Sequence, residues 1–260
     1  MNNGLNGLAL AATVGLAAVG VDVGAGRAAD MAIKAPAIRA AAPYNWSGCY
    51  LGGFVGWGAA NQWKPTDLNG FDTTGVSPWD FSLGNEATGG GTLGCNWQAN
   101  SWLVLGIEGE GGFLKVEGSA PQPLVVVPPG GGFGSVSDTA KVGTGYGLIA
   151  GRLGVAFERL LLYTKLGVAF YDTTATITDA ATPGFVATGS KSQTPFAVGV
   201  GGEYAIFDHW TGKAEYVFFD RGSSFNACGV TGGQNFCWKQ DPSSVHTFKI
   251  GLNYKFWRGW

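Results

Sequence analysis

The sequence predicts an all-β fold, an eight-stranded antiparallel transmembrane barrel of the up-and-down type. Three observations predict it. Apolar and polar residues alternate with a period of two, the strand pattern, in eight separate runs. Short and long connections between these runs alternate strictly. The composition, with 45 glycines among 260 residues and only 13% charged residues, suits a barrel whose outer face contacts lipid.

The same composition excludes several other classes of protein. Lys and Arg number 16 and Asp and Glu number 18, so the chain is not a basic nucleic-acid-binding protein and we expect no nucleic-acid partner. Hydrophobic residues make up 45%, which excludes a highly charged disordered chain. The glycines have no G-X-Y period, which excludes collagen.

The N-terminus predicts export. Residues 8–21 form an apolar run that is shorter than the roughly 20 residues of a membrane-spanning helix but suits the core of a secretory signal. Gly26 and Ala28 provide the small residues of a cleavage site. We expect a signal peptide at 1–28, a Pro/Ala-rich periplasmic linker at 29–43 and the barrel at 44–260. A buried core helix over 8–21 is the alternative.

The predicted strands are long enough to cross a bilayer as tilted strands, which takes roughly 9–11 residues. The strands occupy residues 46–58, 88–98, 101–113, 143–157, 160–171, 193–206, 209–220 and 244–256. Two-residue turns at 99–100, 158–159 and 207–208 alternate with long segments at 59–87, 114–142, 172–192 and 221–243. Outer-membrane barrels have this arrangement, with short periplasmic turns and long extracellular loops.

The two faces of each strand differ sharply in polarity. In 160–171, Leu162 and Leu166 share an apolar face, while Lys165 lies on the opposite face with Tyr163 and Gly167. The polar faces of the other runs carry further charges. Together the predicted lumen charges are Glu108, Glu110, Arg152, Lys165, Glu203, Lys213, Glu215, Lys249 and Lys255. Side chains just fill an eight-stranded barrel, so we expect these charges to pair inside it. A soluble lipocalin-like barrel, with the charged faces outside, is the alternative.

Aromatic residues mark the strand ends and predict two girdles at the membrane interfaces. They are Tyr44, Trp46, Trp97, Trp102, Phe157, Phe170, Trp210, Phe219 and Trp257. The alternative is that these aromatic residues only pack against neighbouring side chains and have no role at the membrane interface. The first long segment is also rich in aromatics, with Trp63, Phe71, Trp79 and Phe81, which makes it a candidate ligand-binding loop.

The four cysteines of an exported chain predict disulfides, and three pairings are possible. Cys228 and Cys237 lie nine residues apart in one long segment, and we expect them to bond. Cys49 and Cys95 lie on the outer faces of adjacent strands, where the register decides whether they bond or remain free thiols. No Cys or His pair has zinc-finger spacing and no phosphate-binding loop is present, so we expect no metal and no cofactor.

One group of Ser, His and Asp residues has the residue types of a hydrolase site. His246 lies close in sequence to Ser243, Ser244 and Asp241. A Ser/His pair needs a third group to orient the histidine, and proximity in sequence does not provide that geometry. The sequence therefore predicts no enzymatic activity.

Several fragments in order resemble one family. They read YNWSG at 44–48, YLGG at 50–53, GCNWQ at 94–98, GIEGE at 106–110, GRLG at 151–154, LYTK at 162–165, GVGGEY at 199–204, KAEY at 213–216 and GLNYKF at 251–256. Residues 30–260 resemble the small porin-like outer-membrane proteins of alphaproteobacteria, known as outer-membrane immunogenic proteins. The family commonly has an aromatic residue where Cys49 and Cys95 stand, and often an Arg-x-Arg pair where this chain has Ala150 and Arg152.

The resemblance implies an eight-stranded barrel in the bacterial outer membrane, surrounded by outer-membrane lipids and lipopolysaccharide. It also implies insertion by the barrel-assembly machinery, which reads a terminal aromatic residue, here Phe256 or Trp260. We expect a structural, surface-exposed role in envelope integrity. The alternatives are a narrow pore for small solutes, or an adhesin or receptor whose loops bind a host or extracellular ligand.

Overall fold

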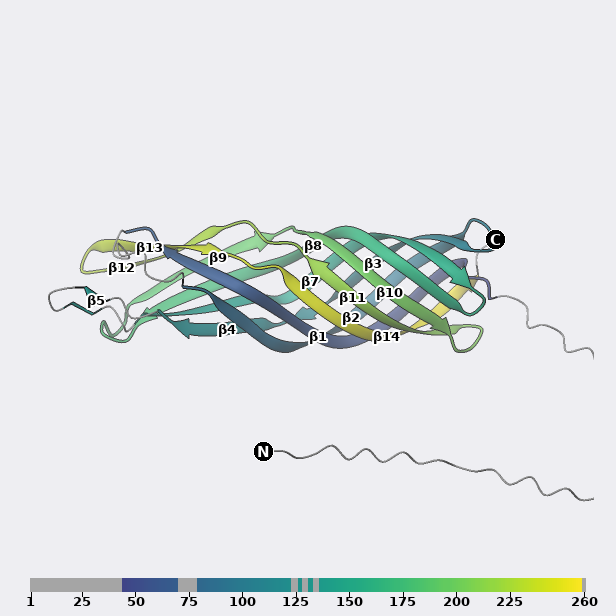
Figure 1. Ribbon diagram of the computed structural model, residues 1–260, viewed down its shortest axis with the longest axis horizontal. Helices are drawn as coiled ribbons and strands as arrows, with labels where there is room; N and C mark the ends of the chain where they lie inside the picture. Colours follow the sequence, from purple (N-terminus) through teal and green to yellow (C-terminus); the bar gives the residue numbers. More distant parts are fainter. Residues whose placement is uncertain (1–43, 70–78, 123–125, 128–130, 133–135, 259–260) are drawn as a thin grey trace, which may run out of the picture. The chain divides into compact units, whose positions relative to one another are not determined.

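The computed structural model describes residues 44–69, 79–122, 126–127, 131–132 and 136–258 (Figure 1). The predicted signal peptide and linker lie outside these residues, as do Phe71 and Trp260. No helix in the described part of the chain is long and apolar enough to span a membrane. The described chain consists of strands joined by turns.

Fourteen strands occur in the described residues. They are β1 (Gly48–Asp67), β2 (Phe81–Gln98), β3 (Leu103–Leu114), β4 (Val116–Pro121), β5 (Val126–Val127), β6 (Gly131–Gly132), β7 (Val136–Phe157), β8 (Leu160–Asp179), β9 (Val186–Gln193), β10 (Phe196–Ala205), β11 (Trp210–Phe219), β12 (Phe225–Thr231), β13 (Gln234–Asp241) and β14 (Val245–Arg258).

Eight of these strands pair in a closed ring. The order around the ring is β1, β2, β3, β7, β8, β10, β11 and β14, and β14 returns to β1. Every pairing is antiparallel, and each ring strand contains or overlaps one of the eight predicted runs. The all-β antiparallel barrel predicted from the sequence is therefore confirmed.

The long segments expected to be loops are largely strand, which corrects the prediction. β1 and β8 run on to Asp67 and Asp179, and β4, β12, β13 and all but the last residue of β9 lie within the former loops. β13 pairs with β1 and β12, β9 pairs with β8 and β12, and β4 pairs with β7. We call these four strands, together with 61–67, 81–87, 136–142 and 172–179, the extension. It continues the barrel wall beyond the ring (Figure 1).

Side-chain polarity inverts between the ring and the extension. In the ring, apolar side chains such as Ile107 and Leu166 point outward and are 69% and 61% exposed, while charged residues point inward. In the extension, Trp63 and Ile177 point inward and are fully buried, and polar residues such as Thr174 point outward. An apolar exterior suits hydrocarbon, and an apolar interior with a polar exterior suits water.

Bulges accommodate this change of environment. In β1, even-numbered residues point inward up to Ala60, and from Trp63 onward odd-numbered residues do. The register shifts between these two residues, and Gln62 adopts a φ of 68°. A bulge inserts an extra residue and re-aims the side chains that follow it. The bulge at Gln62 thus turns Trp63 into the interior of the extension.

The predicted aromatic girdles are only partly present. Six of the nine residues are exposed on the outer face: Trp97, Trp102, Phe157, Phe170, Trp210 and Trp257. Trp46 and Phe219 are buried, so their assignment to the girdles was wrong. Phe219 has the inward parity of β11, opposite to that of Phe218, and Trp46 precedes β1 and packs inside the barrel with half-buried Tyr44.

The inversion of polarity along β8 yields a prediction. Leu166→Arg places a charge in the apolar band of the ring and is expected to cost about 2–4 kcal/mol of stability in lipid. Thr178→Arg, on the same outward face but in the extension, is expected to change stability by well under 1 kcal/mol. The measurement is the urea midpoint of the barrel in vesicles, followed by the mobility of unboiled protein in detergent gels. Equal losses for both variants would contradict the assignment of the ring to the hydrocarbon.

Candidate functional site

The predicted lumen charges lie together inside the ring. Eight of them are buried, with exposures of 1–6%: Glu108, Glu110, Arg152, Lys165, Glu203, Lys213, Glu215 and Lys249. They project from β3, β7, β8, β10, β11 and β14, because each occupies the inward parity of its strand. Four carboxylates face four bases, so the formal charges of this cluster balance.

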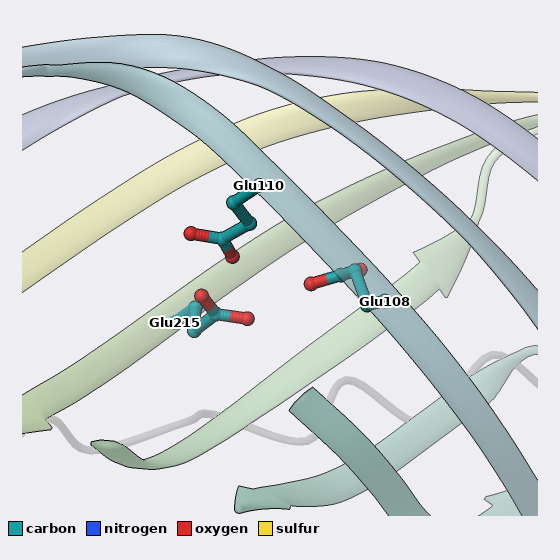
Figure 2. Close-up of side chains that lie close together, drawn as sticks. All are labelled: Glu108, Glu110 and Glu215. Atoms are coloured by element: carbon teal, nitrogen blue, oxygen red, sulfur yellow. The ribbon is translucent and has the colours of Figure 1, made fainter. Parts of the chain in front are cut away.

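Lys165 lies where three of the carboxylates converge. Its Nζ is 2.5 Å from Glu108 Oε1, 2.5 Å from Glu110 Oε1 and 2.7 Å from Glu215 Oε2. Figure 2 shows the three carboxylates directed toward a common point, with Glu108 and Glu110 on β3 and Glu215 on β11. An ammonium group has three N–H donors, so this geometry gives each carboxylate one charge-assisted contact.

Arg152 organises the neighbouring part of the cluster. Its Nη2 lies 2.8 Å from Glu203 Oε2 and its Nη1 lies 3.3 Å from Glu108 Oε2. The guanidinium carbon lies 3.9 Å from the centre of the Tyr163 ring. The arginine therefore bridges two carboxylates from β3 and β10 while stacking on an aromatic face, an arrangement that favours Arg over Lys.

Two further ion pairs cross the lumen. Lys249 Nζ on β14 lies 2.6 Å from Glu110 Oε2, and Lys213 Nζ on β11 lies 3.5 Å from Glu108 Oε2. β3 is not a neighbour of β8, β11 or β14 in the ring, so the ion pairs that Glu108 and Glu110 form with lysines connect strands that share no backbone hydrogen bonds. The network therefore braces the ring across its interior.

Three tyrosines complete the network. Tyr50, Tyr146 and Tyr163 donate hydrogen bonds to Glu108, Glu110 and Glu215 at 2.5, 3.2 and 2.9 Å. Alternation in 160–171 places Tyr163 on the polar face, but Tyr50 and Tyr146 were not among the predicted site residues. The signal was strand parity, because Tyr146 is an even number of residues from Arg152 on β7 and therefore shares its inward face.

A short segment before β1, residues Tyr44–Ser47, closes one mouth of the ring; we call it the cap. Trp46 packs in an apolar cluster that includes Leu161 and Tyr163. The Trp46 N–H donates to Gln98 Oε1 at 2.9 Å, and Lys255 Nζ donates to the Asn45 carbonyl at 2.5 Å. Lys255, the ninth charge that the sequence placed in the lumen, thus holds the cap rather than joining the carboxylate cluster.

The three converging carboxylates have the donor chemistry of a cation site. Oxygen atoms of Glu108, Glu110 and Glu215 lie within 4.8 Å of one another, and carboxylate oxygens are ligands for hard divalent cations. The Lys165 ammonium lies between them, however, so the chain supplies its own cation there. Lys165 is thus the residue that balances this cluster.

The cysteines form two disulfides. Cys228 and Cys237 face each other on β12 and β13 and are bonded, as the sequence predicts. Cys49 and Cys95 are directly opposite in the β1–β2 register, with Cα atoms 4.0 Å apart, and are also bonded. The register thus settles the pairing that the sequence left open.

The Ser/His constellation is not assembled. The His246 ring lies on the outer face, with Nδ1 2.6 Å from the Tyr216 hydroxyl. Asp241 accepts a hydrogen bond from Ser224 at 2.6 Å, and the Ser243 hydroxyl donates to the Ser244 carbonyl. No hydrogen bond connects these groups to His246. Phe256, a candidate assembly signal, points outward near the end of β14.

Comparison with known proteins gives a consistent result. The family described as "Outer membrane protein beta-barrel domain" matches residues 28–256. The 31 kDa outer-membrane immunogenic proteins of Brucella melitensis biotype 1 and Brucella suis biovar 1 are each 30% identical over 237 residues, covering 88% of this chain and 92% of theirs. Among solved structures, the outer membrane protease OmpT of Escherichia coli aligns with a TM-score of 0.52 at 12% identity, covering 82% of this chain and 98% of its own, which indicates a shared barrel fold.

The central position of Lys165 yields a prediction. Lys165→Met removes the cation shared by three buried carboxylates and is expected to cost about 3–5 kcal/mol, because the carboxylates are left uncompensated. The measurement is the urea midpoint in lipid vesicles. Lys191→Met, which removes an exposed lysine from β9, serves as the matched control and is expected to have little effect.

A second substitution tests whether charge balance is the cause. Adding Glu215→Gln to Lys165→Met leaves three carboxylates and three bases in the cluster, so part of the lost stability should return. A double variant that is less stable than Lys165→Met alone would show that packing, not charge balance, dominates this position.

Proposed function

The chain belongs to the outer membrane protein β-barrel domain family and is located in the bacterial outer membrane, and on that premise we propose that it is an eight-stranded structural barrel with a closed lumen. Its role is to anchor a rigid, surface-exposed extension and to contribute to envelope integrity. The observation that carries this proposal is the ion-pair network centred on Lys165, which joins opposite walls of the ring.

The network closes the lumen because its members occupy the space that solutes would need. An eight-stranded ring is only wide enough to be filled by side chains. Here the lysines and Arg152 extend across the interior to carboxylates on other strands, and each of these charged side chains is at least 94% buried. An ion entering the ring would have to break these pairs and lose its own hydration.

Two further features support a closed barrel. The cap places Trp46, 2% exposed, in one mouth of the ring. Beyond the network, the interior of the extension is filled by apolar side chains of the same continuous cluster as Phe54 and Tyr146 in the ring. A solute would therefore meet an aromatic barrier, a charged barrier and an apolar barrier in turn.

The alternatives receive less support from the site. The aromatic-rich first segment was a candidate ligand-binding loop, but Trp63 and Trp79 are buried in the core of the extension. Replacing them would damage the core rather than a ligand site. We propose no enzymatic role, since His246 is hydrogen-bonded to Tyr216 and not to a serine.

The remaining parts of the chain follow from this role. We propose that residues 1–28 direct export and that 29–43 form a periplasmic linker. We further propose that the barrel-assembly machinery inserts the chain and recognises Phe256 or Trp260. Lipopolysaccharide would surround the part of the ring that adjoins the extension.

The closed lumen yields a prediction for conductance. Purified protein reconstituted in planar lipid bilayers is expected to show no discrete current steps, because the charged network fills the ring. The measurement is single-channel recording at both polarities. Reproducible steps from folded wild-type protein would contradict a closed barrel and favour the narrow pore.

A variant of the cap separates the two barriers of the ring. Trp46→Ala removes the aromatic barrier and leaves the ion pairs intact, so it too is expected to be silent. Discrete steps from Trp46→Ala, with a silent wild type, would show that the cap and not the network closes the lumen.

A further inference from the structure

The interior of the extension is an apolar core. Its inward-facing residues come from eight strands and are buried to 9% exposure or less: Trp63, Leu83, Val116, Val136, Ala140, Ala175, Ile177, Ala187, Phe225, Ala227 and Trp238. Their outward neighbours are mostly polar, as Thr174 on β8 illustrates, with Val186 and Val230 as exposed exceptions. The extension therefore has the organisation of a small water-soluble barrel, stabilised by burial of apolar surface from water.

Asp138 is an exception within this core. It lies on the inward face of β7, between Ala120 of β4 and Ile177 of β8 in the pairing register, and is 0% exposed. Ten charged side chains are buried in the described part of the chain, and nine of them lie in the ring. Asp138 is the one buried in the extension.

The polar neighbours of Asp138 do not neutralise its charge. The Trp63 indole N–H donates to Gln240 Oε1 at 2.7 Å, which leaves Gln240 Nε2 as the amide donor beside Asp138. Neither carboxyl oxygen of Asp138, nor Gln240 Nε2, forms a hydrogen bond of acceptable geometry. The polar groups beside Asp138 are therefore neutral, and neither a hydrogen bond of good geometry nor an ion pair compensates its carboxylate.

No base among the described residues faces Asp138 from the strands around it. The inward positions beside it are held by Ala120, Ile177, Trp63 and Gln240, none of which carries a charge. The charged side chains on the surrounding strands lie at exposed or half-buried positions: Lys64 and Asp67 on β1, Glu86 on β2, Glu117 on β4, Lys141 on β7, Asp172 and Asp179 on β8, Lys191 on β9, and Lys239 and Asp241 on β13. Glu117 pairs with Lys141, and Lys239 with Asp241.

We propose that Asp138 makes the extension an acid-stabilised unit, which closes more firmly as the external medium becomes acidic and loosens toward neutral pH. A carboxyl group in an apolar core is tolerated in its neutral form, and ionisation there without a partner is costly. Opening the extension would expose Asp138 to water, where it ionises freely. Protonation therefore favours the closed form.

The direction of the pH effect follows from the shift of this one group. Burial raises the pKa of Asp138 to about 7, and the nearby Gln240, Trp63 and Thr139 backbone offset only part of that rise. In an open extension its pKa returns to about 3.9. Between these values opening releases one proton, so each pH unit upward raises the opening constant about tenfold. Above about pH 7 the effect levels off.

Hydrogen exchange of the full-length barrel in lipid vesicles tests the proposal. After correction for intrinsic exchange rates, the opening constant of peptides covering 61–67, 136–142 and 234–241 is expected to rise about 50-fold from pH 5 to pH 7. Peptides from the ring portions of β3 and β14 are expected to show no such rise. Asp138→Asn, which keeps the shape and removes the ionisation, is expected to abolish the rise in the extension.

Two results would overturn the proposal. One is a wild-type extension whose corrected opening constant is flat from pH 5 to pH 7, a result that needs no variant to interpret. The other is an unchanged rise in Asp138→Asn. Glu117→Gln, which removes an exposed carboxylate of the extension, is the matched control and should retain the full rise. These readouts do not depend on conductance, so they stand apart from the test of the closed lumen.

Discussion

The constraint on which this structure depends is that every backbone hydrogen bond in hydrocarbon must be made within the protein. A sheet satisfies it only by closing on itself, and here β14 returns to β1 to complete the ring. Four of these strands, β1, β2, β7 and β8, then continue into the extension, where water replaces lipid at their outer face. Side-chain polarity must therefore invert partway along these four strands. Bulges such as the one at Gln62 permit this where strict alternation would place the wrong residues inside.

Closure of a narrow ring also determines how its charges pair. Arg152 and Lys165 stand directly opposite each other on β7 and β8, and Glu108 and Glu110 share one face of β3. Like charges are thus neighbours at these positions, whereas Glu203 stands opposite Lys213 and Glu215 opposite Lys249. Glu108 and Glu110 are neutralised largely by lysines across the lumen. Ion pairs between strands that share no hydrogen bonds connect the ring internally. The four carboxylates and four bases balance only as a complete set, so removing any one of them leaves an uncompensated charge in the lumen.

Much of the ring could be predicted from the sequence, because hydrocarbon outside and charge inside give a strong alternation, as Leu162, Lys165 and Leu166 show. The extension was mistaken for loops because its contrast is weaker. In 172–179 the inward residues Ala175 and Ile177 are the only apolar ones and alternate with threonines, a pattern that is also found in polar loops. Which bases meet which carboxylates depends on register and on distances across the lumen. Neither is encoded in the spacing along one strand.

The interior of the barrel holds apolar side chains in the extension and ion pairs in the ring, and the medium outside each part explains the difference. In the extension, water outside makes burial of Ile177 and Trp63 favourable, so an apolar core stabilises that part of the fold. In the ring, lipid outside is as apolar as any core, so moving an apolar side chain inward gains little. Cohesion across the ring must come from interactions that lipid cannot offer, and ion pairs such as Lys165 with Glu110 provide them in a low dielectric. The charged lumen is therefore the counterpart, for a protein in lipid, of the apolar core that the same strands build in water.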